Sequence, residues 1–211
     1  MENTRDREGD TSAGKKIVLG SAHIDLREEM RPDGYRPLAA GLARGLALRG
    51  SPKHQNWRYV ITAARCLDGA HRQFERLREG LDNYRHPDVA AAFNLATDAE
   101  LAVMGLHRAL EMTKEVRTRL GIARSLPVRL SRRAEGIKEL RDAFAHIEER
   151  AAGYRYKRSD PALIRSLYRG AAALLESRTI RFGRRSLGVG KPATDLMMEV
   201  REYLRATWHD L

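Results

Sequence analysis

The sequence of 211 residues contains one cysteine, and only 6% of its residues are aromatic. A lone cysteine, Cys66, cannot form a disulfide within the chain, which suits a reducing compartment, so we expect a cytoplasmic protein. Cys66 lies on the apolar side of a helical pattern, which favours a small buried hydrophobic residue over a nucleophile. Because aromatic residues are few, Ala, Leu and Val must fill most of the core.

The sequence also has no run of roughly 18 apolar residues, which a membrane-spanning helix needs, and no apolar signal-peptide core at its N-terminus. We therefore expect no membrane segment. It contains no phosphate-binding loop and no G-x-G-x-x-G, C-x-x-C or H-E-x-x-H motif. Its seven histidines include no pair at metal-ligand spacing on one helix face, so we expect no metal or other cofactor.

Negative charge is scarce in one part of the chain. The formal net charge is +11, and residues 121–191 alone carry seventeen Lys and Arg against seven Asp and Glu. A concentrated basic region is the pattern expected for a protein that binds the phosphate backbone of a nucleic acid. The alternative is a solvated, arginine-rich surface without a ligand, and charge alone does not decide between the two.

The N-terminal part of the chain differs in pattern from the rest. Residues 1–14 are polar and lack apolar periodicity, so we expect them to be disordered. Residues 37–48 predict a short helix rich in Ala and Leu, which ends before a Gly-Ser-Pro break. We therefore treat residues 1–55 as an N-terminal extension and residues 56–211 as one helical domain.

Beyond the extension, apolar residues recur at three- and four-residue steps, which is typical of one face of an α-helix. Residues 179–189 predict a small hairpin that turns near Gly183. The predicted fold is all-α, an antiparallel helical bundle with a small C-terminal β-hairpin. The predicted helices cover residues 55–83, 87–120, 127–152, 159–174 and 194–208.

The first two long helices differ in how far their apolar residues spread. The expected core face of the first is Trp57, Val60, Ala64, Leu67, Phe74, Leu77 and Leu81. Further apolar residues extend around the second helix, whose main stripe is Val89, Phe93, Ala96, Val103, Leu106, Leu110 and Val116. A helix that is apolar on several sides is central in a bundle, or buries a second face against another subunit.

The most informative stretch is residues 138–150, KELRDAFAHIEER, within the third long helix. At about 100° per residue, Arg141 lies just beside the core face, while His146 lies on the opposite face, flanked by Asp142 and Glu149. His146 therefore faces solvent, another helix or a partner chain, and Arg141 can bend toward the same cleft. The expected core face of this helix is Leu130, Ala134, Ile137, Leu140, Phe144, Ile147 and Ala151.

Arg and His together suit the cleavage of RNA by its own 2′-hydroxyl. That reaction needs a base for the hydroxyl proton, an acid for the leaving oxygen and a cation for the phosphorane. A His side chain with a pKa of about 6.5 transfers protons at neutral pH. The planar fork of an Arg side chain binds phosphate through two hydrogen bonds. Such a reaction needs no metal.

The segment R-D-A-F-A-H, from Arg141 to His146 on a helix of a helical bundle, resembles the HEPN superfamily. The signature of that family is Arg, four to six residues and then His, usually with a polar residue directly after the Arg. The resemblance covers about residues 56–152. It implies a dimer that brings two Arg/His pairs into one cleft, which in many members is a metal-independent endoribonuclease. By this resemblance Arg141 and His146 would be catalytic, and Asp142 would support them.

Two other pairs, Arg49/His54 and Arg65/His71, also have a spacing that the signature allows. They differ in context, because a glycine or a cysteine directly follows the arginine. Only Arg141 has both a polar residue after it and a helical setting.

The leading hypothesis is a cytoplasmic homodimer that binds RNA and cleaves it without a metal, as a toxin or phage-defence component. An antitoxin or another protein is a further expected partner, although Glu148 stands where toxins with a nucleotidyltransferase antitoxin usually carry Tyr. The alternatives are a non-catalytic RNA-binding or protein-interaction module, and a structural helical protein with an accidental Arg/His spacing. The residues expected to bind the substrate are Arg132, Arg133, Lys138, Arg150, Arg184 and Arg185.

Overall fold

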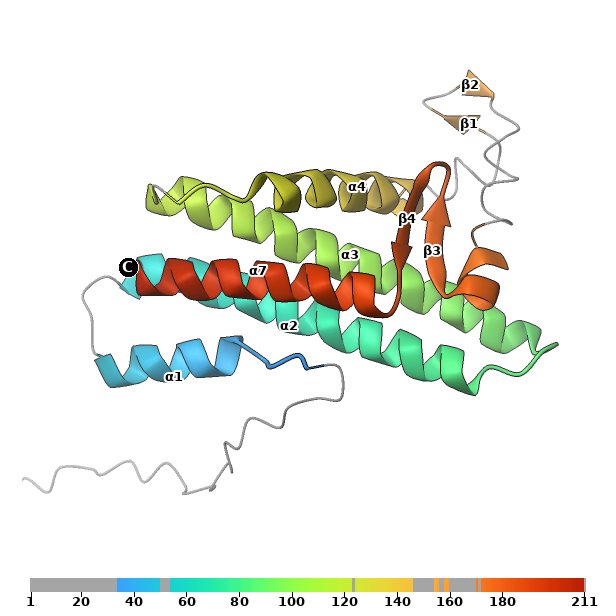
Figure 1. Ribbon diagram of the computed structural model, residues 1–211, viewed down its shortest axis with the longest axis horizontal. Coiled ribbons are helices and arrows are strands. Elements are labelled where there is room, and N and C mark those ends of the chain that lie inside the picture. Colours follow the sequence, from blue (N-terminus) through green and yellow to red (C-terminus); the bar gives the residue numbers. More distant parts are fainter. Residues whose placement is uncertain are drawn as a thin grey trace, which may run out of the picture.

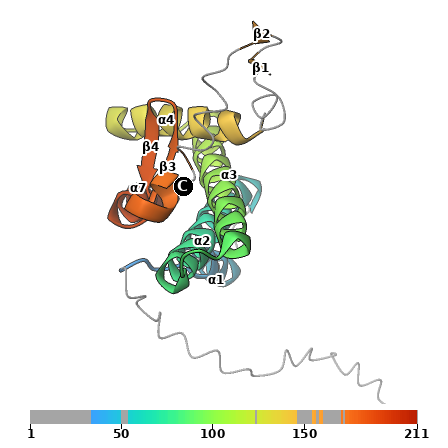
Figure 2. The ribbon, with the colours of Figure 1, turned by 90° about the vertical axis from the view of Figure 1, so that its right-hand side faces the viewer.

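In the computed structural model, the described residues are 34–49, 54–122, 124–145, 154–155, 158–159, 170 and 172–210. They form an antiparallel helical bundle with a small β-hairpin near the C-terminus, so the predicted all-α fold is confirmed (Figure 1). The elements are α1 (Ala39–Arg49), α2 (His54–Asn83), α3 (Val89–Leu120), α4 (Val128–Ala145), β1 (Tyr154–Arg155), β2 (Arg158–Ser159), β3 (Thr179–Phe182), β4 (Arg185–Gly188) and α7 (Lys191–His209). Seen end-on, α1 and α4 lie on opposite sides of the bundle, with α2 and α3 between them (Figure 2).

The central pair of the bundle is α2 and α3, which run side by side along most of its length (Figure 1). All seven residues expected on the core face of α2, from Trp57 to Leu81, are buried. The two helices approach closely at one point, where a Cβ added to Gly105 would lie 3.4 Å from the Cα of Ala70. Small residues at this contact allow the two backbones to come together, because side-chain size sets the distance between packed helices.

The buried face of α3 differs from the predicted stripe at its N-terminal end. Val103, Leu106, Leu110 and Val116 are buried as expected. The expectation is wrong for Val89 and Phe93, which are 65% and 72% exposed. These two residues lie on the side of α3 that faces away from α2. The side that packs against α2 carries Leu95 and Ala99 instead, both of which are buried.

By length and composition alone, α3 could cross a membrane. One third of its most apolar segment, 33%, is buried inside the bundle. The length and composition of α3 are weak evidence for a membrane span, since the core helix of a soluble protein can have both. The expectation that the protein has no membrane segment therefore stays a prediction.

The helix that carries Arg141, α4, packs against α3 and beside the hairpin (Figures 1 and 2). Four of its expected core residues are buried, namely Leu130, Ala134, Ile137 and Leu140. Phe144 is half-buried against the same core, and the expected core residues Ile147 and Ala151 lie outside the described residues.

The predicted C-terminal hairpin is present as β3 and β4. The strands pair antiparallel on either side of a turn that contains Gly183, whose φ of 56° suits a residue without a Cβ. Ile180 and Leu187 lie opposite each other in the two strands, and both are buried. This apolar pair fixes the face of the hairpin that packs on the bundle. A shift of the strands by one residue relative to the bundle would turn both side chains outward.

The segment between α4 and the hairpin contains a pair of short strands that the sequence does not predict. Tyr154 in β1 pairs with Ser159 in β2. Ser159, the predicted first residue of the next helix, lies in β2. The rest of that predicted start lies outside the described residues. Residues 172–177 are helical, and Leu174 is buried as expected.

The last helix, α7, lies along α2 and closes the core (Figure 1). It begins three residues before the predicted start and ends one residue after the predicted end. Near its C-terminus, Trp208 packs on Trp57 of α2 with the ring centroids 4.9 Å apart. The residues expected on its buried face are all buried: Leu196, Val200, Tyr203 and Leu204.

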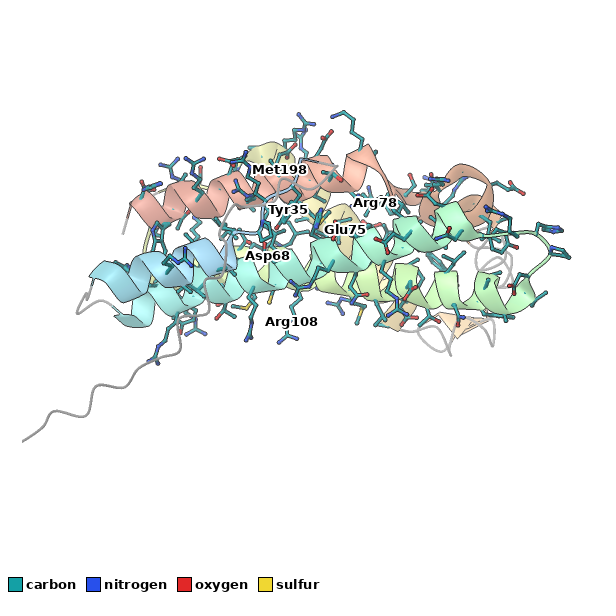
Figure 3. All side chains as sticks on the ribbon, turned by 90° about the horizontal axis from the view of Figure 1, so that it is seen from below. Tyr35, Asp68, Glu75, Arg78, Arg108 and Met198 are labelled. Atoms are coloured by element: carbon teal, nitrogen blue, oxygen red, sulfur yellow. The ribbon has the colours of Figure 1, made fainter. Side chains whose placement is uncertain are left out.

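Part of the predicted N-terminal extension belongs to the same core. Tyr35 is fully buried, and its hydroxyl donates a 2.7 Å hydrogen bond to Oδ1 of Asp68 on α2 (Figure 3). The Asp68 carboxylate also accepts hydrogen bonds from the backbone N–H groups of Leu38 and Ala39, at 2.9–3.1 Å. It therefore caps the N-terminus of α1 from another helix. The expected disorder of residues 1–14 lies outside the described residues.

Candidate functional site

Arg141 lies at the edge of the core face of α4, as its position on the helix predicts, and its side chain is 30% exposed. Its neighbours Leu140 and Ala143 are buried against the bundle, which directs the Arg141 side chain toward α3. There its Nη2 atom lies 2.8 Å from Nε2 of His107. Its Nη1 atom lies 3.0 Å from Oδ1 of Asp142. The expected support of Arg141 by Asp142 thus has a geometric basis.

The contact with Arg141 decides where His107 carries its proton. A guanidinium group can only donate hydrogen bonds, so Nε2 of His107 must accept, and a neutral ring must then hold its proton on Nδ1. His107 is 9% exposed, and its burial, followed by the charge of Arg141, lowers its pKa below the ordinary 6.5. His107 is therefore a neutral side chain with a single N–H donor.

Arg141 and His107 line a pocket of about 610 Å³ between α2, α3 and α4. Arg65 of α2 and Arg108 of α3 also line it, so arginines from three helices contribute to one pocket. Arg108 projects outward from the bundle (Figure 3). None of the described residues that line the pocket is Asp or Glu. An anionic group is the ligand that this arrangement favours.

The floor of the pocket is apolar and formed by small residues. Gly69 and Ala70 of α2 and Gly105 of α3 line it, and Ala70 lies directly against Gly105. Leu101 and Met104 form part of its wall, and they are 47% and 38% exposed. The pocket therefore exists because small side chains on α2 and α3 leave room that α4 does not fill.

Several buried polar atoms around this pocket have no hydrogen-bond partner. They are Oε1 of Gln73, Nδ1 of His107 and Nε of Arg141. The described part of the chain has only two other side-chain atoms of this kind. Buried polar groups are usually hydrogen-bonded, and unpaired ones are rare in native proteins. Three of these buried, unpaired atoms belong to residues that line this one pocket.

Two of the predicted site residues, His146 and Arg150, lie outside the described residues. The structure therefore does not place the proposed catalytic histidine relative to Arg141. The position of His146 on the opposite side of the helix from the core stays a prediction.

The other basic residues predicted to bind substrate differ in their contacts. Arg133 donates to Oε1 of Glu199 at 2.9 Å and to the Pro192 carbonyl at 2.7 Å, which ties α4 to α7. Arg185 forms two 2.6 Å hydrogen bonds with Glu139, which tie the hairpin to α4. Both side chains thus serve the fold, and they can reach a phosphate only if these contacts open.

The remaining predicted substrate-binding residues lie on the surface. Arg132 and Arg184 are exposed, on α4 and at the hairpin turn. Lys138 is exposed and lies 3.8 Å from Oε1 of Glu135, a loose surface pair. Neither arginine nor this lysine lines the pocket that contains Arg141.

In the competing Arg65/His71 pair, the two side chains lie in different surroundings. His71 is 1% exposed, stacks on Tyr35 at 3.9 Å between ring centroids and lies 3.5 Å from Glu75. It is a core histidine. Arg65 lines the pocket of Arg141 instead. The side chains of Arg49 and His54 lie outside the described residues.

Sequence patterns missed Gln73, His107 and Arg108 of the pocket, and they included Arg65 only as part of the rejected Arg65/His71 pair. A signal was present for His107, which is the one histidine in the apolar second helix and is directly followed by an arginine. Its proximity to Arg141 depends on how α3 packs on α4, which no local pattern shows. Cys66, expected in the core, is half-buried and lines the same pocket.

A larger pocket of about 800 Å³ lies between α4 and α7. Carboxylates of Asp195, Glu199 and Glu202 line it together with Arg124 and Arg129. The mixture of signs makes it a poorer anion site than the pocket of Arg141. Among the described residues, no group of three His, Cys, Asp or Glu side chains is placed to hold a metal ion.

No protein-family model, curated protein sequence or solved structure matches this chain. The resemblance to the HEPN superfamily therefore rests on the residues of the motif and on the helical bundle.

Proposed function

We propose that the protein is a metal-independent endoribonuclease of the HEPN type, acting as a toxin or in phage defence. The observation that carries this proposal is the pocket of Arg141, which three arginines line and in which no described lining residue is acidic. RNA is the favoured anionic partner because the net charge of +11 is concentrated in residues 121–191, which include α4.

In this proposal Arg141 binds the scissile phosphate. Its Nη1 and Nη2 atoms contact Asp142 and His107, and each of these nitrogens carries a second N–H that can donate to a phosphate oxygen. Asp142 holds the guanidinium in place. His146 transfers the protons, and Arg65 and Arg108 attract the backbone at the rim of the pocket.

A second candidate function is RNA binding without cleavage. The observation that favours it is the double contact of Arg141, because a guanidinium bound to His107 and Asp142 also links α3 to α4. In that case the pocket would bind RNA, and the Arg/His spacing would have no catalytic meaning.

We further propose that the protein is a cytoplasmic homodimer that uses the outer face of α3. Val89 and Phe93 are large apolar residues exposed one helical turn apart on this face. Exposed apolar residues that form one patch often mark a protein interface. The face continues to Leu101 at the edge of the pocket, so a second chain bound there would lie close to it. An antitoxin is another partner for the same face.

The test is cleavage of a labelled, structured RNA by the purified protein in EDTA, beside Arg141→Ala and His146→Ala. Arg129→Ala is the matched control, since Arg129 is a 77% exposed arginine on the same helix that does not line the pocket and is not among the expected substrate-binding residues. We expect cleavage by the wild type and the control. We expect a loss of about 100-fold or more in His146→Ala, which removes the proton-transfer group, and in Arg141→Ala, which removes the cation on the phosphate. Thermal unfolding shows whether each variant is folded.

Binding of RNA without cleavage would instead support the second candidate. Cleavage that continues in folded Arg141→Ala and His146→Ala would refute the assignment of both residues.

A further inference from the structure

Another pocket with a basic lining lies between α1 and the C-terminal half of α7, two helices that both pack along α2 (Figure 1). Its volume is about 360 Å³, and it shares no lining residue with the pocket of Arg141. Arg36, which precedes α1, lines it together with Arg201 and Arg205 of α7. None of its described lining residues is Asp or Glu. This composition favours an anionic ligand.

The guanidinium group of Arg201 is held in place at this pocket. The residue is only 9% exposed. Its Nε donates to the backbone carbonyl of Arg36 at 2.7 Å, and its Nη1 donates to Oε1 of Glu202 at 2.7 Å. Within the described part of the chain, the remaining nitrogen, Nη2, has no hydrogen-bond partner, yet it is not among the buried unpaired atoms. It therefore keeps exposed surface and can donate to a ligand.

The Glu202 carboxylate is shared between two arginines. Its Oε2 lies 3.7 Å from Nη1 of Arg205, and its side chain is 53% exposed. Burial of a guanidinium charge costs free energy unless an anion or hydrogen bonds compensate for it. A carboxylate that is half in water compensates only partly for the buried charge of Arg201. A second anion at this pocket would therefore stabilise Arg201 and Arg205 together.

We infer that this pocket binds a compact free phosphate compound, such as inorganic phosphate or diphosphate. A phosphate group carries up to two negative charges on oxygens that accept several hydrogen bonds, which suits arginines from two segments of the chain. The volume lies near the lower end of the range for small-ligand pockets, roughly 300–1,000 Å³, so a compact anion fits better than a length of polymer. The inference goes beyond the proposed nuclease and does not depend on it.

The experiment is isothermal titration calorimetry of the full chain with inorganic phosphate, inorganic diphosphate and a short RNA oligonucleotide, with the ionic strength held constant by sodium chloride. We expect saturable binding of diphosphate. Intrinsic fluorescence gives a second readout, because Trp208 lines the pocket, Trp57 packs on it at 4.9 Å, and the chain has no other tryptophan. The emission should change with the same dissociation constant.

Arg205→Ala removes one guanidinium group from the pocket. Arg205 is 58% exposed, so the fold should tolerate the change. We expect diphosphate to bind about tenfold or more weakly, because a charge-assisted hydrogen bond is lost. Arg119→Ala is the matched control, since Arg119 is 62% exposed, also pairs with a glutamate on its own helix and does not line the pocket. It should bind diphosphate as the wild type does.

A substitution at Gly41 tests the charge of the pocket. Gly41 lines the pocket in the first turn of α1, and a Cβ added there meets nothing within 4 Å. Gly41→Glu brings a carboxylate to the arginines, so it should abolish diphosphate binding. Gly41→Gln adds a side chain of the same size without the charge and should still bind diphosphate. Both new residues favour a helix more than glycine does, so neither variant should unfold.

Three results would overturn the inference. One is no saturable binding of phosphate or diphosphate to the wild type. Another is diphosphate binding that is unchanged in folded Arg205→Ala and Gly41→Glu. The third is binding of the oligonucleotide that is tighter than that of diphosphate and is lost in Gly41→Glu, which would assign the pocket to RNA. A wild type that binds diphosphate but cleaves no RNA would refute the nuclease alone, and the reverse would refute this site alone.

Discussion

Arg141 and His107 are 34 positions apart in the sequence, and a 2.8 Å contact joins Nη2 of Arg141 to Nε2 of His107 across α4 and α3. The contact has two consequences. It holds the guanidinium at the mouth of an arginine-lined pocket, and it places the His107 proton on Nδ1. Arg141, which the motif contains, and His107, which lies outside it, are thus joined by a direct contact.

The first prediction concerns pH and His107. Burial and then the charge of Arg141 lower the pKa of His107; Glu111 and Asp142 raise it with less effect than these two, and Lys114 lowers it with the smallest effect. Below pH 6.5 the unfolded chain therefore binds a proton that the folded protein does not, and the free energy of unfolding falls as pH falls. Urea unfolding at about pH 7.5 and about pH 5.5 should show this loss.

The comparison for that prediction is His107→Gln, which cannot titrate. Its free energy of unfolding should change less between the two pH values than that of the wild type. An equal change in both proteins would show that His107 contributes nothing to the pH dependence.

The second prediction concerns Asp68, whose carboxylate accepts hydrogen bonds from Tyr35, Leu38 and Ala39. Asp68→Ala leaves these donors without their acceptor in a buried region, so we expect the free energy of unfolding to fall by about 1–3 kcal/mol. Hydrogen exchange should increase most in α1, which loses its cap. Asp82→Ala is the control, since Asp82 is 59% exposed, and it should change stability by less than about 0.5 kcal/mol.

The third prediction concerns Arg185 and Glu139, a surface pair joined by two 2.6 Å hydrogen bonds. Arg185→Ala should lower the free energy of unfolding only slightly, because both side chains are about half exposed to water. The difference from the wild type should shrink when the salt concentration rises from about 0.05 M to about 0.5 M, as surface charges are screened. A difference independent of salt would show that the pair acts through packing instead.

The fourth prediction concerns the exposed face of α3. If it is the subunit interface, Val89→Ser with Phe93→Ser should convert a dimer into a folded monomer, because both side chains are exposed in the single chain and contribute little to its core. Sedimentation velocity measures the change. Val128→Ser on α4 removes an equally exposed apolar residue and should leave the dimer intact. A wild type that is monomeric at all concentrations would contradict the proposed homodimer.

Local sequence patterns predicted most of the helices and the hairpin, since each depends on neighbours in the chain. The face of α2 is apolar at helical spacing along its full length, and every predicted core residue on it is buried. The same reasoning was wrong for Val89 and Phe93. Their spacing fits a core stripe, but α2 packs on a different side of α3 there.

The candidate site was only partly predictable. Arg141 and Asp142 could be chosen because a motif joins them on one helix. Arg65, Gln73 and His107 could not, because they come from two other helices and have no fixed spacing from the motif. Tyr35 and Asp68 show the same limit, since a residue of the predicted extension turned out to lie in the core.

The sequence by itself determined the helical class, the positions of the long helices and the concentration of positive charge, because periodicity and charge are properties of short segments. Only the tertiary structure decided which arginines meet and which histidine contacts Arg141. It also decided which polar atoms are buried without a partner. These depend on close packing at Gly105 and Ala70, where the absence of large side chains brings α2 and α3 together and leaves the pocket open beside α4.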